Sequence, residues 1–102
     1  MKNYEIMFIV RPTLTEDEIK NVAKKFETIL TDNGAKVTNT KDMGQRELAY
    51  EIKKFKNGYY FLINLESNDD KAIKEFDRMA GISSDIIRHL ITKLEDYEVH
   101  YE

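Results

Sequence analysis

The sequence predicts an α+β sandwich in which a four-stranded antiparallel sheet has two helices on one face. Three observations lead to this fold class: the expected elements follow the order βαββαβ, a hairpin signal separates the two helices, and each helix has one apolar stripe. A chain of 102 residues is of the size that forms one core. We therefore expect one domain over residues 1–94, followed by an acidic C-terminal tail over residues 95–102.

The first strand and the first helix have clear local signals. Residues 3–11 predict a strand because β-branched and aromatic residues alternate there, and Pro12 ends it. Thr15 and Glu18 have the spacing of a capping box, which begins a helix. Apolar residues then recur at helical spacing as far as Asn33–Gly34, which predicts a left-handed helix end.

A hairpin is expected in the middle of the chain. A long second strand begins at Ala35, with a bulge expected at Gly44 because the two-residue period resumes only afterwards. Asn57–Gly58 predicts a type I′ turn, since both residues tolerate positive φ. The third strand, Tyr59 to Glu66, is therefore expected to run antiparallel to the second.

The second helix is expected after Ser67–Asp70, where polar side chains can cap its start, and Gly81 is expected to end it. A final strand spans Asp85 to Leu94. Two helical crossovers around a hairpin form the split βαβ motif. The sequence thus predicts a ferredoxin-like βαββαβ sandwich.

The strands have more apolar residues than one covered face needs. We expect the helices to cover the face with Ile6, Phe8, Phe61, Ile63, Leu65 and Leu90. A contiguous apolar patch on the other face would mark a partner site, although scattered exposed apolar residues are ordinary. The partner-binding residues predicted on that face and on the alternating tail are Met7, Ile9, Tyr60, Leu62, Ile87, Ile91, Tyr97, Val99 and Tyr101.

Composition and motifs argue against several classes of protein. Cysteine is absent, which excludes disulfides and thiolate metal sites, and the cytoplasm is the expected compartment. No stretch reaches the length of a signal-peptide core or a membrane span. Phosphate-binding loops, nucleophile elbows and metalloprotease motifs are lacking, and the two histidines stand far apart. We expect no enzyme activity, cofactor, metal, small-molecule substrate or membrane partner.

Basic residues gather in the predicted hairpin. Between Lys36 and Lys56 there are six basic residues and three acids, whereas the whole chain has a net charge of −3. One interpretation is a solvated edge hairpin whose lysines prevent edge pairing. The other is an arm that binds the phosphates of a nucleic acid.

The run from Gly44 to Lys53, GQRELAYEIK, resembles the signature of the family of the sixth protein of the bacterial small ribosomal subunit. The resemblance extends over nearly the whole chain, through the segments Tyr4–Glu5, Arg11–Pro12, Gly58–Tyr60 and Arg88–Leu90.

The resemblance implies a non-catalytic, ribosome-associated component of the 30S subunit. Such a protein binds the central domain of 16S ribosomal RNA as a heterodimer with ribosomal protein eighteen. The alternative is a ferredoxin-like, small-molecule-binding regulatory domain that forms homo-oligomers. The RNA-binding residues that the resemblance and the charge pattern indicate are Lys2, Arg46, Lys53, Lys54, Lys56, Arg88 and His89.

Overall fold

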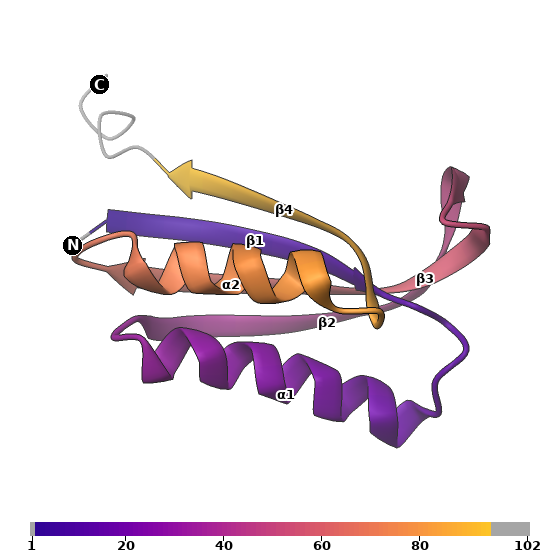
Figure 1. Cartoon of the computed structure of the whole chain (residues 1–102), viewed down its shortest axis with the longest axis horizontal. Helices are drawn as coiled ribbons and strands as arrows, with labels where there is room; N and C mark the ends of the chain where they lie inside the picture. The colour runs from indigo at the N-terminus through magenta and orange to yellow at the C-terminus, as the bar shows by residue number, and fades with distance from the viewer. Residues whose placement is uncertain (1, 95–102) are drawn as a thin grey trace.

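The ferredoxin-like prediction is confirmed by the computed structural model, which describes residues 2–94 (Figure 1). The elements are β1 (Lys2–Val10), α1 (Glu16–Asp32), β2 (Lys36–Ile52), β3 (Phe55–Ser67), α2 (Lys71–Ile82) and β4 (Ile86–Leu94). All neighbouring strands are antiparallel, in the order β2-β3-β1-β4. The predicted tail residues Tyr97, Val99 and Tyr101 lie outside the described residues. None of the helices described is long and apolar enough to cross a membrane.

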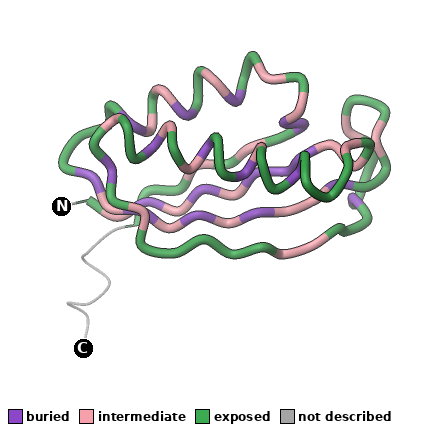
Figure 2. The backbone as a smooth tube through the Cα atoms, turned by 90° about the horizontal axis from the view of Figure 1, so that it is seen from below, coloured by how far each residue is buried: buried purple, intermediate pink, exposed green. Residues whose placement is uncertain are grey.

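Both helices lie on the same side of the sheet (Figure 2). The main core lies between the two layers and is built around four phenylalanine rings. Phe8 of β1 lies with its ring centroid 6.0 Å from Phe26 of α1, 5.8 Å from Phe76 of α2 and 5.4 Å from Phe61 of β3. Such aromatic clusters bury a large apolar area. The two helices are therefore fixed against one face of the sheet only.

Helix α1 begins and ends as its sequence predicts. The Thr15 hydroxyl accepts a hydrogen bond from the Glu18 backbone N–H, and the Glu18 carboxylate accepts one from the Thr15 N–H. This reciprocal pair satisfies two N–H groups that the first helical turn leaves without a partner. At the other end Gly34 has a φ of +92°, which permits the chain to turn out of the helix.

The predicted hairpin turn at Asn57–Gly58 is wrong. The turn lies at Lys53–Lys54, whose φ values are +50° and +71°, and Ile52 pairs with Phe55 on either side of it. Gly58 lies inside β3, where a Cβ atom would come within 2.2 Å of the Ile9 Cγ2 atom. The glycine is therefore needed for close packing between strands, and the left-handed turn forms at two lysines instead.

The predicted faces of β4 are wrong from Arg88 onward. Val10 pairs with Ile86 and Ile9 pairs with Arg88, so Ile87 is an extra residue that forms a bulge. The bulge changes the alternation of the side chains. Leu90, predicted under the helices, lies on the opposite face and is 56% exposed, whereas the predicted partner residue Ile91 packs against the main core.

Two smaller differences concern α2 and β3. Helix α2 continues through Gly81 to Ile82, and β3 begins at Phe55 rather than Tyr59. The Asp69 carboxylate accepts a hydrogen bond from the Lys71 N–H at the start of α2.

The bulge predicted at Gly44 is confirmed by its φ of +80° and by a shift in the β2–β3 register there.

Candidate functional site

The face of the sheet opposite the helices, which we call the open face, is apolar over only half of its length. Its side chains form rows across the strands, because directly paired residues point to the same side. Two rows are apolar except at their margins: Gly44–Tyr60–Ile9–Arg88 and Lys41–Leu62–Met7–Leu90. The next rows are mainly polar and contain Asn64, Glu5 and Thr92, then Glu66, Asn3 and Leu94. The apolar half lies toward the β2–β3 turn.

The predicted open-face positions of Met7, Tyr60 and Leu62 are confirmed, and all three side chains are half-buried. Ile9 and Ile87 also lie on this face, but they are 3% and 4% exposed because Leu48 of β2 packs on them. These two predicted partner residues are therefore covered by the chain itself. They form a second, smaller core with Leu48.

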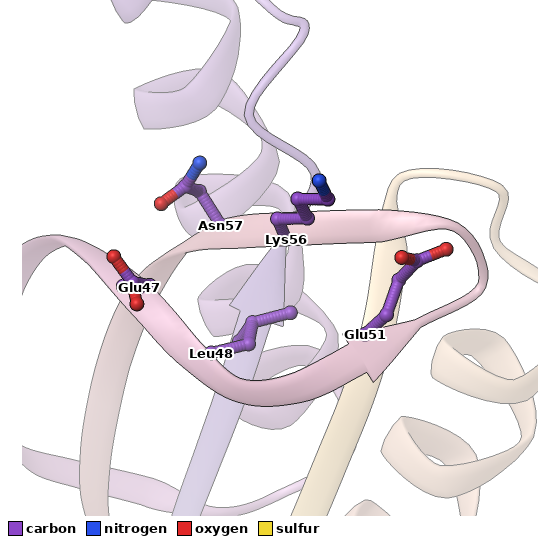
Figure 3. Close-up of a pocket in the computed structure, with 5 residues that line it drawn as sticks. All are labelled: Glu47, Leu48, Glu51, Lys56 and Asn57. Atoms are coloured by element: carbon purple, nitrogen blue, oxygen red, sulfur yellow. The ribbon is translucent and has the colours of Figure 1, made fainter.

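Leu48 reaches the open face because β2 bulges strongly near the turn. Between the pairs Glu47–Asn57 and Ile52–Phe55, β2 has the four residues 48–51 where β3 has only Lys56. The two strands bow apart around a hollow of about 300 Å³, lined by Glu47, Leu48, Glu51, Lys56 and Asn57 (Figure 3). We call residues 46–58, the bowed end of the hairpin, the arm. The end of the arm is turned toward the β4 side of the sheet (Figure 1).

A hydrogen bond connects the arm to β4. Arg88 Nη1 donates to the Tyr50 hydroxyl at 2.6 Å, and this bond raises the pKa of Arg88. Tyr50 is 62% exposed and belongs to neither core. Between the arm and the sheet lies a groove of about 170 Å³. Its lining residues are Met7, Ile9, Leu48, Ala49, Tyr50, Ile52, Tyr60, Arg88 and Leu90.

Four of the predicted RNA-binding residues lie together on the arm. Lys53 and Lys54 form its tip, and Lys56 follows on β3, all three with exposed side chains. In the part of the chain that the structure describes, none of these lysines forms an ion pair. Arg46 is also exposed and donates from Nε to the Met43 carbonyl oxygen. The arm thus presents cationic groups that are free to approach phosphates.

Arg88 lies beside the arm, but Lys2 and His89 do not. Lys2 pairs with Ser67 at the opposite end of β1, roughly 25 Å along the strand from the arm. His89 lies on the helix side of the sheet, where its Nε2 atom is 2.7 Å from Asp77 Oδ1 of α2. These two residues therefore do not belong to the same surface as the lysines.

Two residues of this site could not be recognised from the sequence pattern. Lys41 extends the apolar row of Leu62 on the β2 side, a position that only the register between the strands reveals. Leu90 is the most exposed apolar residue of the open face, and the bulge that places it there has no glycine to mark it. Within residues 2–94, no three acidic or histidine side chains gather into a potential metal site.

A single-sided sandwich with an uncovered apolar half-face and a cationic arm defines a small binding protein of the ferredoxin-like class. Residues 3–93 match the family model described as Ribosomal protein S6. The chain is also similar to the crystal structure of 30S ribosomal protein S6 from Thermotoga maritima, with a TM-score of 0.90 and 30% sequence identity over 97% of this chain and 92% of that chain.

The chain therefore belongs to the ribosomal protein S6 family. Members of this family are structural proteins of the small ribosomal subunit that act in translation and are not enzymes. This membership confirms the family prediction made from the signature over Gly44–Lys53.

Proposed function

We propose that this ribosomal protein binds the central domain of 16S ribosomal RNA as a heterodimer with ribosomal protein eighteen. In this proposal the arm binds RNA phosphates, while the apolar half of the open face binds the protein partner. The observation that carries the proposal is the position of these two surfaces. The helices cover one face of the sheet (Figure 2). The arm adjoins the apolar half of the other face, where Tyr50 of the arm lines a groove together with Met7 and Leu90.

The distribution of charge supports the proposal that both chains contribute to the RNA-binding surface. The whole chain has a net charge of −3. Four basic residues for which no ion pair occurs in the described part of the chain lie together on the arm: Arg46, Lys53, Lys54 and Lys56. Sequence-independent affinity for RNA depends on the number of phosphates that basic side chains neutralise. The isolated protein is therefore expected to bind RNA weakly, and a basic partner would complete the cationic surface.

The chemistry of the open face supports a protein partner there. Leu90 is 56% exposed beside the half-buried side chains of Met7 and Leu62. A row of neighbouring apolar side chains in water is a typical site of protein–protein contact, and aliphatic side chains offer RNA neither charge nor stacking surface.

The RNA part is tested by charge reversal on the arm. The triple variant K53E/K54E/K56E should weaken binding of the heterodimer to a fragment of the RNA central domain and flatten its dependence on salt concentration. The matched control is K20E/K24E/K25E, which makes the same charge change on the exposed side of α1. Equal salt slopes for the arm variant and the wild type in a filter-binding titration would contradict a role for the arm. Equal losses of RNA affinity in the arm variant and in the α1 control variant would also contradict a role for the arm.

The partner part is tested by placing a charge on the open face. Leu62→Asp should abolish heterodimer formation at micromolar concentrations while the domain stays folded, because Leu62 lies outside the main core. Thr28→Asp adds the same charge on the helix side and should leave association unchanged. Analytical ultracentrifugation of the mixed chains gives the result. Unimpaired association of the Leu62→Asp variant would refute this partner face.

The same titration tests the idea that the two chains share the RNA-binding surface. Isolated protein and heterodimer are compared on the same RNA fragment at the same salt concentration. The heterodimer should bind far more tightly. Equal affinity would show that the partner contributes nothing to RNA binding.

A further inference from the structure

The arm extends beyond the rest of the sheet. Pairing between β3 and β1 ends at Tyr59–Val10, so within residues 2–94 the two strands of the arm pair only with each other. Pairing is also interrupted inside the arm, where residues 48–51 of β2 stand against Lys56 alone. A two-stranded hairpin is at best marginally stable by itself. The position of the arm therefore depends on side-chain contacts with the sheet.

Two kinds of side-chain contact hold the arm against the open face. Apolar side chains of the arm, chiefly the buried Leu48, pack on Ile9 and Ile87. The second contact is the hydrogen bond of 2.6 Å from Arg88 Nη1 to the Tyr50 hydroxyl. In the described part of the chain, it is the one side-chain hydrogen bond that connects the arm with β1 or β4. Apolar packing has no preferred direction, whereas a hydrogen bond fixes the direction between its two groups.

This hydrogen bond joins strands from opposite edges of the sheet. In the order β2-β3-β1-β4, two strands lie between β2 and β4, which would place them about 14 Å apart in a flat sheet. Tyr50 belongs to β2 and Arg88 to β4, so their contact requires the arm to turn across the open face toward β4 (Figure 1). Because Tyr50 is 62% exposed, packing alone does not fix its hydroxyl. The bond to Arg88 therefore determines where the arm ends.

The lysines of the arm move with Tyr50. Lys53 and Lys54 follow it at the tip, and Lys56 lies on the returning strand. A displacement of the arm would therefore displace all three ammonium groups together. Binding is tighter when the groups that contact a partner are already held in their bound arrangement, because less conformational entropy is then lost.

We propose that Arg88 is a positioning residue that holds the arm over the open face through Tyr50 and thereby sets the three lysines for contact with RNA phosphates. The proposal rests on the RNA-binding role proposed above for the arm. Arg88 acts on RNA affinity through Tyr50 and makes no phosphate contact of its own. Its planar guanidinium presents N–H donors in a fixed geometry, which suits it to hold a hydroxyl group in one place.

The first measurement follows the arm in the full chain without RNA. Tyr50→Phe removes the hydroxyl but keeps every charge and the ring that lines the groove. Backbone order parameters of residues 48–54 from NMR relaxation should fall from about 0.85, typical of rigid backbone, toward about 0.6. The matched control is Tyr59→Phe, which removes a tyrosine hydrogen bond of 3.1 Å to the Asp42 carboxylate on the helix side and should leave these values unchanged. Unchanged order parameters in Tyr50→Phe would overturn the proposal.

The second measurement is a double-mutant cycle on RNA binding by the heterodimer. Tyr50→Phe and Arg88→Met should each weaken binding to the RNA fragment about three- to tenfold. The double variant should lose no more affinity than either single variant, because both changes remove the same hydrogen bond. Since no phosphate contact is lost, the salt slope should stay that of the wild type. Tyr59→Phe should bind RNA as the wild type does.

Three results of this cycle would overturn the positioning role. The first is wild-type affinity of Tyr50→Phe. The second is a salt slope that Arg88→Met flattens by about one, which would indicate a direct phosphate contact. The third is a double variant in which the two losses multiply, since the residues would then act independently.

The triple variant K53E/K54E/K56E separates this proposal from the proposed function. If the triple variant binds RNA as tightly as the wild type, the arm has no role in RNA binding and both proposals fail. If it loses affinity while Tyr50→Phe does not, only the positioning role of Arg88 is refuted.

Discussion

Replacing Gly58 by alanine tests the account of the hairpin most directly. An added Cβ atom would lie 2.2 Å from Cγ2 of Ile9, and Ile87 Cδ1 stands 3.4 Å away. Carbon atoms in contact prefer about 3.5–4.0 Å, so the two strands must separate by about 1.3 Å or Ile9 must change its rotamer. Ile9 is only 3% exposed and is branched at Cβ, so neither adjustment is easy.

Overpacking of this kind costs about 1–3 kcal/mol, and the short contact places Gly58→Ala toward the upper limit. For a domain of this size, each kcal/mol corresponds to about 4–8 °C in Tm, so the variant should melt roughly 10–20 °C lower. Differential scanning calorimetry and urea denaturation both measure the change. The matched control is Gly81→Ala in α2, where no atom lies within 4 Å of the added Cβ and stability should rise by about 0.5 kcal/mol.

A double-mutant cycle identifies the contact responsible. Ile9→Ala removes the Cγ2 atom and will itself destabilise the domain, but in that background Gly58→Ala should cost almost nothing more. Two results would refute the reasoning. One is a Gly58→Ala protein that melts within about 2 °C of the wild type. The other is a destabilisation by Gly58→Ala that is equally large in the wild type and in the Ile9→Ala background.

Three further predictions concern the first helix and the arm. Thr15→Ala removes one half of the capping box and should lower the free energy of unfolding by about 1 kcal/mol in urea denaturation, and an unchanged midpoint would contradict the cap. Hydrogen bonds from the Thr15 backbone N–H and side chain hold the pKa of Glu18 below its ordinary value of 4.5. The ionised Glu18 carboxylate therefore stabilises the folded state above that value. This contribution is lost as the pH falls through the lower pKa that Glu18 has in the folded state. Stability of the Glu18→Gln variant should accordingly depend less on pH than that of the wild type between about pH 5 and pH 3, and parallel curves would exclude this contribution. Lys53→Asn with Lys54→Gly supplies residues that accept positive φ and should raise stability by about 0.5–1 kcal/mol, whereas a loss would show that the lysines are not strained there.

The order of the elements could be predicted from the sequence because each helix and each strand has its own local signal. The capping box at Thr15–Glu18 and the stop at Gly34 depend on neighbouring residues alone, and both are present in the structure. The signal at Asn57–Gly58 is equally local, but a contact between distant strands overrides it. Turn propensity amounts to about 1 kcal/mol, whereas moving the turn would displace Gly58 from its packed position against Ile9.

The composition of the candidate site was easier to predict than its geometry. The excess of lysine in the hairpin identifies the arm, and the alternation of β1 and β3 places Met7 and Leu62 on the open face. The bulge at Ile87 could not be predicted, because neither glycine nor a change in residue type marks it. That one extra residue decides whether Leu90 or Ile91 faces the helices.

The unequal halves of the open face determine how a partner can be oriented. Near the arm, the neighbours are Met7, Leu62 and Leu90, whereas the far half contains Glu5 and Asn64, joined by a hydrogen bond of 3.4 Å. A partner rotated by half a turn about the normal to the sheet would set its apolar side chains against a carboxylate and an amide. Desolvating those groups without new hydrogen bonds would be unfavourable, so in the proposed heterodimer the sheet would favour one orientation of the partner over the rotated one.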